Sequence, residues 1–474
     1  MADRINSVCI INCFDTYEHR VDLLHDYFKS IDAEVRVITS DYRHFEKCRR
    51  TDCKEDFEFG DSANDLKISE YRDNYRVESL KKSIELAEGQ SRTKRVLVLA
   101  SVASMVDQFN VPNIRLLQKL GYSVDVACNF IQGNSCSVEQ IEKLKILLEE
   151  MGVRYYQIDF SRSVFRFDKN YHAYRQVKNV MKNNQYSFVH CHSPIGGVIG
   201  RIAAHNTKTH AMYTAHGFHF FKGAPKKNWI VFYPIEKVLS RITDYLITIN
   251  SEDYSLAAKK FSSNKIVKIP GVGIDVEKFQ NASGDPTLKN KLGITQNDFV
   301  LISVGEINDN KNHRAIIEAI HILNDSQIKY LIVGMGALKE SLQNLVAEYK
   351  LENQVFFLGF RDDVAQLLKI ADVFCFPSKR EGLGLAAVEA MASGLPLITS
   401  NVHGINDYSV NGKTGYSCSP NDYSAFAKSI RELMLNKDKR KEFGRYNEKM
   451  SEKYSVKKVD LLMRQIYSEM GDLL

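Results

Sequence analysis

The sequence predicts an α/β protein built from two Rossmann-like domains that face a cleft, with C-terminal helices closing the structure. The chain has 474 residues, which is too many for one ordinary hydrophobic core. Short β-branched runs alternate with amphipathic stretches of helical length, and this alternation predicts parallel β-α-β units. It stops over the glycine-rich residues 271–286, which predict a linker, and then restarts.

The first complete domain is expected over residues 94–270. Its expected strands are RVLVLAS (95–101), YSVDVAC (122–128), VRYYQI (153–158), SFVHCH (187–192), AMYTAHG (211–217) and DYLITI (244–249). Residues 112–121 and 141–152 carry apolar side chains at helical spacing and predict two of the connecting helices. In an open parallel sheet the ligand lies at the carboxyl ends of the strands, so we expect the site there.

The second domain is expected over residues 287–450. Its expected strands are FVLISVG (299–305), KYLIVGMG (329–336), QVFFLGF (354–360), DVFCFPS (372–378) and LPLITS (395–400). The chain from about Asn421 onward has an all-helical pattern. We expect its last helix, within residues 451–474, to cross back to the first domain.

Residues 1–93 form an additional segment in front of the two domains. VCIIN, a helix around YEHRVDLLHDYFKSI and AEVRVIT make one β-α-β unit, whose layout repeats that of residues 95–128. One such unit cannot build a stable sheet alone. The segment therefore looks like the truncated start of another domain of the same kind.

The charge of the chain is concentrated in its middle. Residues 91–270 contain 25 Lys and Arg but only 12 Asp and Glu. The corresponding numbers are 14 and 20 in residues 1–90, and 25 and 26 in residues 271–474. Such a block favours an anionic partner, although a solubilising surface is the alternative. No nucleic-acid fold motif accompanies it, so we expect no nucleic-acid partner.

Cysteine usage and the N-terminus indicate the compartment. The nine cysteines include no C-x-x-C pair and fit neither a disulfide framework nor a zinc site. The N-terminus lacks the apolar stretch of a signal peptide, and no apolar run approaches eighteen residues. We expect a cytoplasmic protein.

The strongest chemical signal is the stretch from Ser378 to Glu389. Gly382 and Gly384 let the backbone approach a ligand between a strand that ends at Pro377 and a helix that starts near Leu385. The first amides of that helix present the positive end of its dipole, which suits a phosphate. Glu389 lies one turn into the helix and Glu381 before it; a solvated charge and an ordinary helix-start acid are the alternatives.

The spacing Glu381-x7-Glu389, followed by AMASGLP, resembles the signature of glycosyltransferase family 4. That family is retaining, has the GT-B fold and uses nucleotide-activated sugars. Supporting matches are TAHG (214–217), PGVGID (270–275) with Phe279, and Val304-Gly305 with Lys311. The stretches HSPIGGVIGR and AHGFHFFKG further resemble members that build bacterial capsule or exopolysaccharide units on a lipid carrier.

The resemblance implies roles for individual residues. Lys311 would hold the donor diphosphate, Glu389 the ribose, Glu381 the donor sugar, and His216 would lie across the cleft. The catalytic set it implies is Glu381, His216 and Lys311, and the donor-binding set is Arg380, Gly382, Leu383, Gly384, Leu385 and Glu389. No metal or other cofactor is expected, and no D-x-D triplet occurs in the chain.

Two features depart from the family pattern. Members usually carry arginine after the glycine that precedes the lysine motif, whereas this chain has Glu306. Lys311 would then act with Arg380, Lys379 or helix amides instead. The first domain also has Ser101-Val102-Ala103-Ser104 in place of a glycine-rich first loop.

Two further stretches carry weaker expectations. His190 and His192 follow each other in one strand and are expected to face opposite sides, with His192 toward the strand end as a minor candidate. Residues 218–242 mix Phe, Trp and Tyr with Lys222, Lys226, Lys227 and Lys237. This composition fits a surface helix that meets anionic headgroups, or a helix that buries its aromatic residues in its own domain.

These patterns favour a metal-independent hexosyltransferase. It would move a sugar from a nucleotide-sugar, with UDP expected, to a lipid-linked or glycan acceptor in surface polysaccharide synthesis, at the inner face of the membrane. A nucleotide-sugar epimerase and a non-catalytic nucleotide-sugar-binding partner of another transferase are the alternatives.

Overall fold

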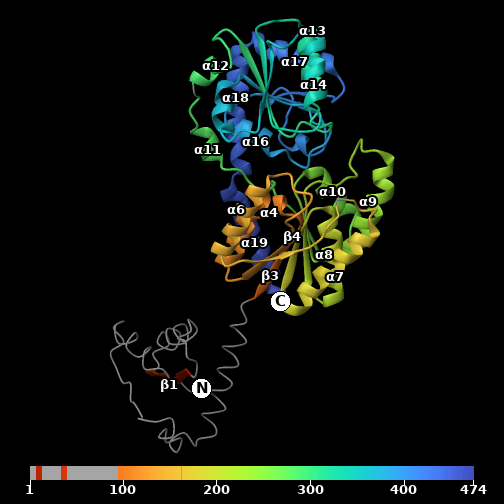
Figure 1. The fold of residues 1–474 in the computed structure, drawn as a ribbon, viewed down its shortest axis with the longest axis vertical. Coiled ribbons are helices and arrows are strands. Elements are labelled where there is room, and N and C mark those ends of the chain that lie inside the picture. Colours follow the sequence, from red (N-terminus) through yellow and green to blue (C-terminus); the bar gives the residue numbers. More distant parts are fainter. Residues whose placement is uncertain (1–6, 13–33, 40–93, 162, 285, 474) are drawn as a thin grey trace, which may run out of the picture. The chain divides into compact units, whose positions relative to one another are not determined.

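The computed structural model describes residues 7–12, 34–39, 94–161, 163–284 and 286–473 (Figure 1). The chain divides into two units, Met1–Arg92 and Thr93–Leu474. In the first unit, strands β1 (Ser7–Asn12) and β2 (Glu34–Thr39) form a parallel pair in which Ser7 lies opposite Glu34. The helix expected between them falls outside the described residues.

The second unit begins with a seven-stranded parallel sheet in the order β5-β4-β3-β6-β7-β8-β9. Its strands are β3 (Arg95–Val102), β4 (Ser123–Asn129), β5 (Arg154–Gln157), β6 (Phe188–His192), β7 (His210–Ala215), β8 (Tyr245–Thr248) and β9 (Lys265–Lys268). The chain runs outward from β3 to β5 and then returns to β6 on the other side of β3. The carboxyl ends of β3 and β6 thus form the switch point where such sheets bind ligands.

Helices cover both faces of this sheet. They are α4 (Ala103–Phe109), α5 (Val111–Lys119), α6 (Val138–Glu150), α7 (Phe167–Asn184), α8 (Pro194–Thr207), α9 (Lys226–Leu239), η2 (Ser240–Ile242) and α10 (Ser251–Lys260). Along β3, Val96 and Val98 belong to one buried cluster while Leu97 and Leu99 belong to another. Burial on both faces explains why the strand is a nearly continuous apolar run.

The second domain is a six-stranded parallel sheet in the order β12-β11-β10-β13-β14-β15. Its strands are β10 (Phe299–Val304), β11 (Ile328–Val333), β12 (Val355–Gly359), β13 (Val373–Phe376), β14 (Leu397–Ser400) and β15 (Gly415–Cys418). Its helices are α12 (Pro286–Lys291), α13 (Arg314–Leu323), α14 (Lys339–Glu348), α15 (Val364–Ile370), α16 (Leu385–Ala392), η3 (His403–Asp407) and α17 (Tyr423–Leu435). Here the switch point lies between β10 and β13, and two Rossmann-like domains are confirmed.

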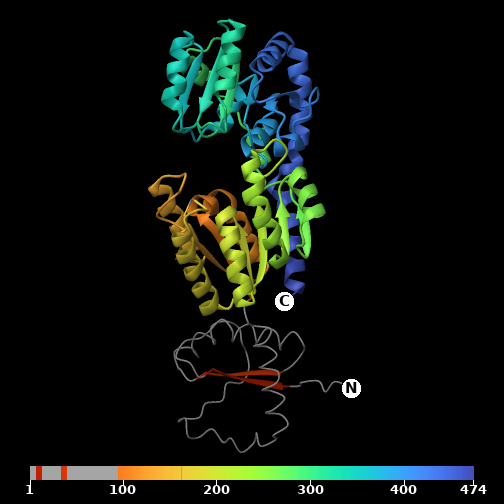
Figure 2. The same cartoon turned by 90° about the vertical axis from the view of Figure 1, so that its right-hand side faces the viewer.

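The C-terminal helices connect the two domains, and Figure 2 shows them in blue running from one to the other. Helix α18 (Lys437–Ser451) packs on α16, whereas η4 (Glu452–Tyr454) leads into α19 (Val456–Asp472), which packs on α5. At the crossing, the Ile274 amide donates to the Tyr454 carbonyl at 2.9 Å, and the Val456 amide donates to Ile274 at 3.0 Å. The two segments that pass between the domains are therefore hydrogen-bonded to each other.

Three elements differ from the sequence expectation. Strands β9 and β15 were not expected, because each is a four-residue edge strand too short to show alternation. Within the expected linker, α11 (Val276–Gln280) forms a short helix. The Asp275 side chain accepts a hydrogen bond from the Lys278 amide at 3.0 Å, and Val276 and Phe279 are buried. Capping and packing against α16 stabilise a turn that the surrounding glycines obscured.

Candidate active site

The predicted site residues of the second domain lie at its switch point. Gly305 and Lys311 follow β10, and the loop from Ser378 to Gly384 follows β13. Gly384 has φ +93° and stands directly before α16. A Cβ at this position would lie 2.5 Å from the Phe376 ring, so the position requires glycine for both its backbone angle and its space.

Lys311 and Glu381 form an ion pair, with 2.7 Å between Lys311 Nζ and Glu381 Oε1. The side chains are 20% and 13% exposed, and Lys311 Nζ also lies 4.6 Å from the centroid of the Phe376 ring. The family resemblance assigned Lys311 to the diphosphate and Glu381 to the sugar of one donor, and the structure brings the two side chains into direct contact. An anionic ligand would compete with Glu381 for the ammonium group.

Glu389 lies in the first turns of α16, beside α11. Burial raises the pKa of its carboxyl group, and the positive charge of Lys278 partly opposes that rise. In the loop after β13 the Ser378 hydroxyl, and beside Gly384 the Tyr408 hydroxyl, are buried without a hydrogen-bond partner in the described part of the chain. Buried hydroxyls without partners are uncommon, and a ligand is one way to satisfy them.

Glu306 stands where the family has arginine, and the two residues proposed to replace that arginine, Lys379 and Arg380, have different contacts. Glu306 is exposed to solvent. Lys379 Nζ pairs with Asp309 Oδ1 at 2.6 Å, whereas the backbone carbonyl of Arg380 accepts from Asn310 at 2.9 Å. The positive charge of Arg380 and, more strongly, burial lower the pKa of His219 to about 4. Arg380 therefore lies near a histidine of the first domain.

In the first domain, His190, His192 and His216 form one cluster. The expectation that His190 and His192 face opposite sides was wrong: residues two apart on a strand share a face, and these rings are 4.1 Å apart. His190 contacts the hydroxyls of Tyr467 at 2.9 Å and Thr214 at 2.8 Å. His192 Nδ1 lies 3.2 Å from His216 Nε2, so His192 supports the candidate catalytic histidine.

Burial keeps these histidines neutral. It lowers the pKa of His190 to about 3 and that of His216 to about 4, and it lowers the pKa of His192 well below its usual value. His192 Nε2 is buried without a hydrogen-bond partner among the described residues. An unpaired buried N–H is rarer than an unpaired acceptor, so we assign the His192 proton to Nδ1, which donates to His216 Nε2. His216 then carries its own proton on Nδ1.

The two halves of the site touch through glycines. A Cβ at Gly382 would lie 1.9 Å from the His216 carbonyl oxygen, and one at Gly217 would lie 2.9 Å from Gly382 Cα. A Cβ at Gly404 would lie 1.9 Å from the Gly382 carbonyl oxygen. Larger residues at these positions would separate His216 from the loop that carries Glu381.

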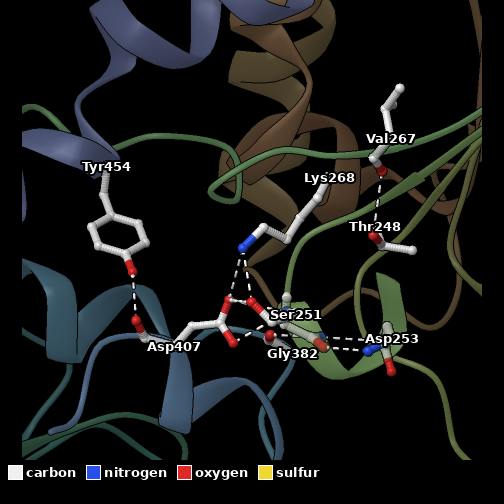
Figure 3. A network of polar contacts seen from close by, with 9 residues as sticks. Thr248, Ser251, Asp253, Val267, Lys268, Gly382, Asp407 and Tyr454 are labelled. Carbon is white, nitrogen blue, oxygen red and sulfur yellow. Dashed lines mark hydrogen bonds and ion pairs between the residues drawn. The ribbon is translucent and has the colours of Figure 1, made fainter. Parts of the chain in front are cut away.

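Polar contacts from the start of α10 reinforce this junction (Figure 3). Asn250 donates to the Gly382 carbonyl at 3.1 Å, and Asp253 Oδ1 lies 2.9 Å from Nε2 of the buried His403. The Ser251 hydroxyl donates to Asp407 at 2.9 Å. These residues could not be predicted from the sequence, because their partners are more than 130 positions away and no local pattern marks them.

In the aromatic segment 218–242 the structure supports the second of the two alternatives, a helix that buries its aromatic residues in its own domain. Phe218 and Phe220 are buried, and Phe220 packs against Trp229 and Tyr233. The exposed face of α9 instead carries lysines and aliphatic residues: Lys226, Lys227, Ile230, Pro234, Lys237 and Val238. The basic surface remains, but its apolar component is aliphatic.

Comparison with known proteins identifies the family. Residues 285–450 match the family "Glycosyl transferases group 1", and residues 95–250 match "Glycosyl transferase 4-like". The chain is 35% identical to EpsD of Bacillus subtilis (strain 168), a protein assigned to the glycosyltransferases, over 390 residues covering 80% of this chain and 98% of EpsD. The chain belongs to this glycosyltransferase family. The predicted family resemblance and enzyme class are confirmed.

Other relatives and solved structures agree. Over 260 residues, 53% of this chain and 67% of the relative, the chain is 35% identical to the UDP-Gal:alpha-D-GlcNAc-diphosphoundecaprenol alpha-1,3-galactosyltransferase of Escherichia coli. The structure of Anabaena HepE in complex with UDP superimposes with a TM-score of 0.64 at 18% identity, covering 79% of this chain and all of HepE. Together with WaaG, at a TM-score of 0.59, this likeness confirms the GT-B fold.

Among the described residues, no group of three or more His, Cys, Asp or Glu side chains is placed to hold a metal ion. No helix in the same part of the chain has the length and apolar character needed to cross a membrane.

Proposed function

We propose that this glycosyltransferase is a retaining, metal-independent enzyme that moves a sugar from a UDP-sugar to a lipid-linked or glycan acceptor in surface polysaccharide synthesis. The observation that carries the proposal is the Lys311–Glu381 pair beside the start of α16, with Glu389 in the same helix and neutral His216 across the glycine junction. A lipid-diphosphate acceptor in one relative and bound UDP in one structural neighbour support it.

The chemistry follows from where charge develops. Cleavage of the bond between sugar and diphosphate leaves negative charge on the departing oxygen, which Lys311 and the first amides of α16 stabilise. The diphosphate displaces Glu381 from Lys311, and the Glu381 carboxylate then accepts hydrogen bonds from hydroxyl groups of the donor sugar. His216 donates from Nδ1 to another hydroxyl of that sugar. The Glu389 carboxylate accepts hydrogen bonds from the hydroxyl groups of the ribose.

The acceptor reaches the site from an anionic membrane surface at the cytoplasmic face. The exposed face of α9 combines Lys226, Lys227 and Lys237 with Ile230 and Val238, which are 74% and 61% exposed. Lysines beside exposed aliphatic side chains suit an interface of anionic headgroups and acyl chains. This surface supports the proposal that a diphospholipid carrier binds close to the first domain.

The test uses the full chain, a panel of UDP-sugars and, in vesicles, diphospholipids that carry one, two or three sugars. We expect UDP release equal to glycan growth, with NMR showing that the new linkage retains the donor's anomeric configuration. Conversion of one UDP-sugar into another without UDP release would identify an epimerase. Donor binding without turnover by the chain alone would favour a non-catalytic partner of another transferase.

The membrane component is tested separately with vesicles containing anionic lipid. Replacing Lys226 and Lys227 with alanine should weaken association by about 1 kcal/mol per lysine. Lys259 and Lys260, an exposed pair at the end of α10, provide the matched control. Equal binding by both double variants at low and high salt would contradict a specific role for α9.

A further inference from the structure

Two neighbouring cavities in the first domain form one groove. The near lobe of this groove is a cavity of about 430 Å³ that lies at the switch point and includes Ser101, Ser193 and His219 in its lining. The far lobe is a cavity of about 640 Å³ that lies beyond the ends of β4 and β5. Gly133 and Ser161 line both cavities, so the two cavities adjoin at these residues.

The near lobe opens beside the proposed donor site. His219 lines this lobe, and the positive charge of Arg380, from the loop between β13 and α16, helps to lower the pKa of His219. The floor is well defined: Ser101 and Ser193 hydroxyls are 2.7 Å apart, and Ser193 has φ +61° at the start of α8. Strained backbone of this kind is concentrated at functional sites. The apolar side chain of Phe165 completes one wall, so this lobe can receive a sugar ring.

The far lobe is lined with fixed amides and carboxylates. Gln157 donates to Asn129 Oδ1 at 3.1 Å and to Asp159 Oδ1 at 3.0 Å, and Gln176 donates to Asp159 Oδ2 at 2.8 Å. These two amides and His172 lower the pKa of Asp159 and keep it ionised. Asp168, whose pKa the Arg166 side chain lowers to about 2, is a second anion in the lining.

This lining suits sugar hydroxyl groups. Ionised carboxylates accept hydrogen bonds from hydroxyl groups strongly, and amides can both donate and accept. Asp168 is paired with Arg166, and Lys169 lies in the same lining, so selectivity for a sugar rests on hydrogen bonding and not on net charge. The side chains are positioned by their own hydrogen bonds, which limits the entropy lost on binding.

We propose that the far lobe is a second sugar subsite, so that the acceptor is a glycan of at least two sugars extending from the near lobe into the far lobe. This inference rests on the proposed function, because the near lobe is assigned to the sugar that receives the transferred residue. The sugar in the far lobe is the one nearer to the diphospholipid, so the lipid end of the acceptor leaves the groove beyond the far lobe.

The experiment measures binding of free saccharides to the full chain in the presence of saturating UDP. A glycan array of hexose and N-acetylhexosamine mono-, di- and trisaccharides serves as the probe. We expect the best disaccharide to bind at least tenfold more tightly than either of its monosaccharides. Asp159→Asn should remove about tenfold of that gain, as expected for a lost charged hydrogen bond, while monosaccharide binding stays the same.

Asp438→Asn, an exposed change of the same type in α18, is the control and should bind as the wild type does. Equal affinity for mono- and disaccharides, absence of binding to all arrayed saccharides, or an unchanged gain in Asp159→Asn would overturn the proposal. UDP binding by the same samples reports on the donor site independently. Its loss with intact disaccharide binding would contradict the proposed function and leave the second subsite standing.

Discussion

The two halves of the site are built in different ways. The second-domain half is local in sequence and charged: one loop and the helix after it supply Glu381, the glycine backbone and Glu389, and Lys311 joins them. The first-domain half is assembled from separate strands and is neutral, because burial keeps His190, His192 and His216 unprotonated. A charged half suits a nucleotide diphosphate and a neutral half suits sugars, so the comparison separates the binding of the nucleotide from the positioning of the sugars.

The largest effect is expected from a substitution in the charged half. Lys311→Met keeps an unbranched side chain on the Phe376 ring but removes the ammonium group, so transfer should fall about 10²-fold or more. Lys311→Arg keeps the charge and should recover part of the rate. Single-turnover kinetics with a UDP-sugar measure the step, and Lys413→Ala, an exposed change in the same domain, is the control. An unaffected Lys311→Met enzyme would contradict the assigned role.

A smaller effect is expected from the neutral half. His192→Leu removes the hydrogen bond that orients His216, worth about 0.5–1.5 kcal/mol, so turnover should fall about two- to twelvefold. His192→Asn restores a donor near the position of Nδ1 and should recover activity, while KM for the UDP-sugar stays constant. Equal losses in both variants would show that His192 acts only through packing.

The same half should make the fold sensitive to acid. An unfolded histidine has a pKa near 6.5, whereas His190 and His216 have pKa values of about 3 and about 4. Between these values the unfolded chain binds more protons, so stability falls as pH decreases from about 6.5 to about 4. Chemical denaturation across this range should show a shallower slope for His190→Gln, and the same slope for His205→Gln, an exposed control. An identical slope in all three proteins would refute the assignment.

The smallest effect is expected outside both halves. Because the structure divides between Arg92 and Thr93, a chain beginning at Thr93 should melt and turn over like the full protein. Calorimetry and UDP release measure this directly. Aggregation, or loss of UDP binding, would show that residues 1–92 contribute to the fold or the site.

The comparison also explains what the sequence could predict. The order of strands and the loop from Ser378 to Glu389 follow from short-range patterns: β-branched runs, glycine positions and a helix start. The pairing of Asp253 with His403, and of Ser251 with Asp407, depends on how two sheets pack. The histidine cluster needed only the two-residue period of a strand, which was applied wrongly to His190 and His192.

The assignment of nucleotide binding to one half and sugar positioning to the other can be tested with one variant from each. UDP binding to the full chain is measured by titration calorimetry for wild type, Glu389→Ala and His216→Ala, together with transfer by the same samples. Glu389→Ala should lose about 1.5–3 kcal/mol of UDP binding, the contribution of a charged hydrogen-bonding group. His216→Ala should bind UDP like the wild type and yet transfer sugar slowly. UDP binding that depends on His216 and ignores Glu389 would contradict the account.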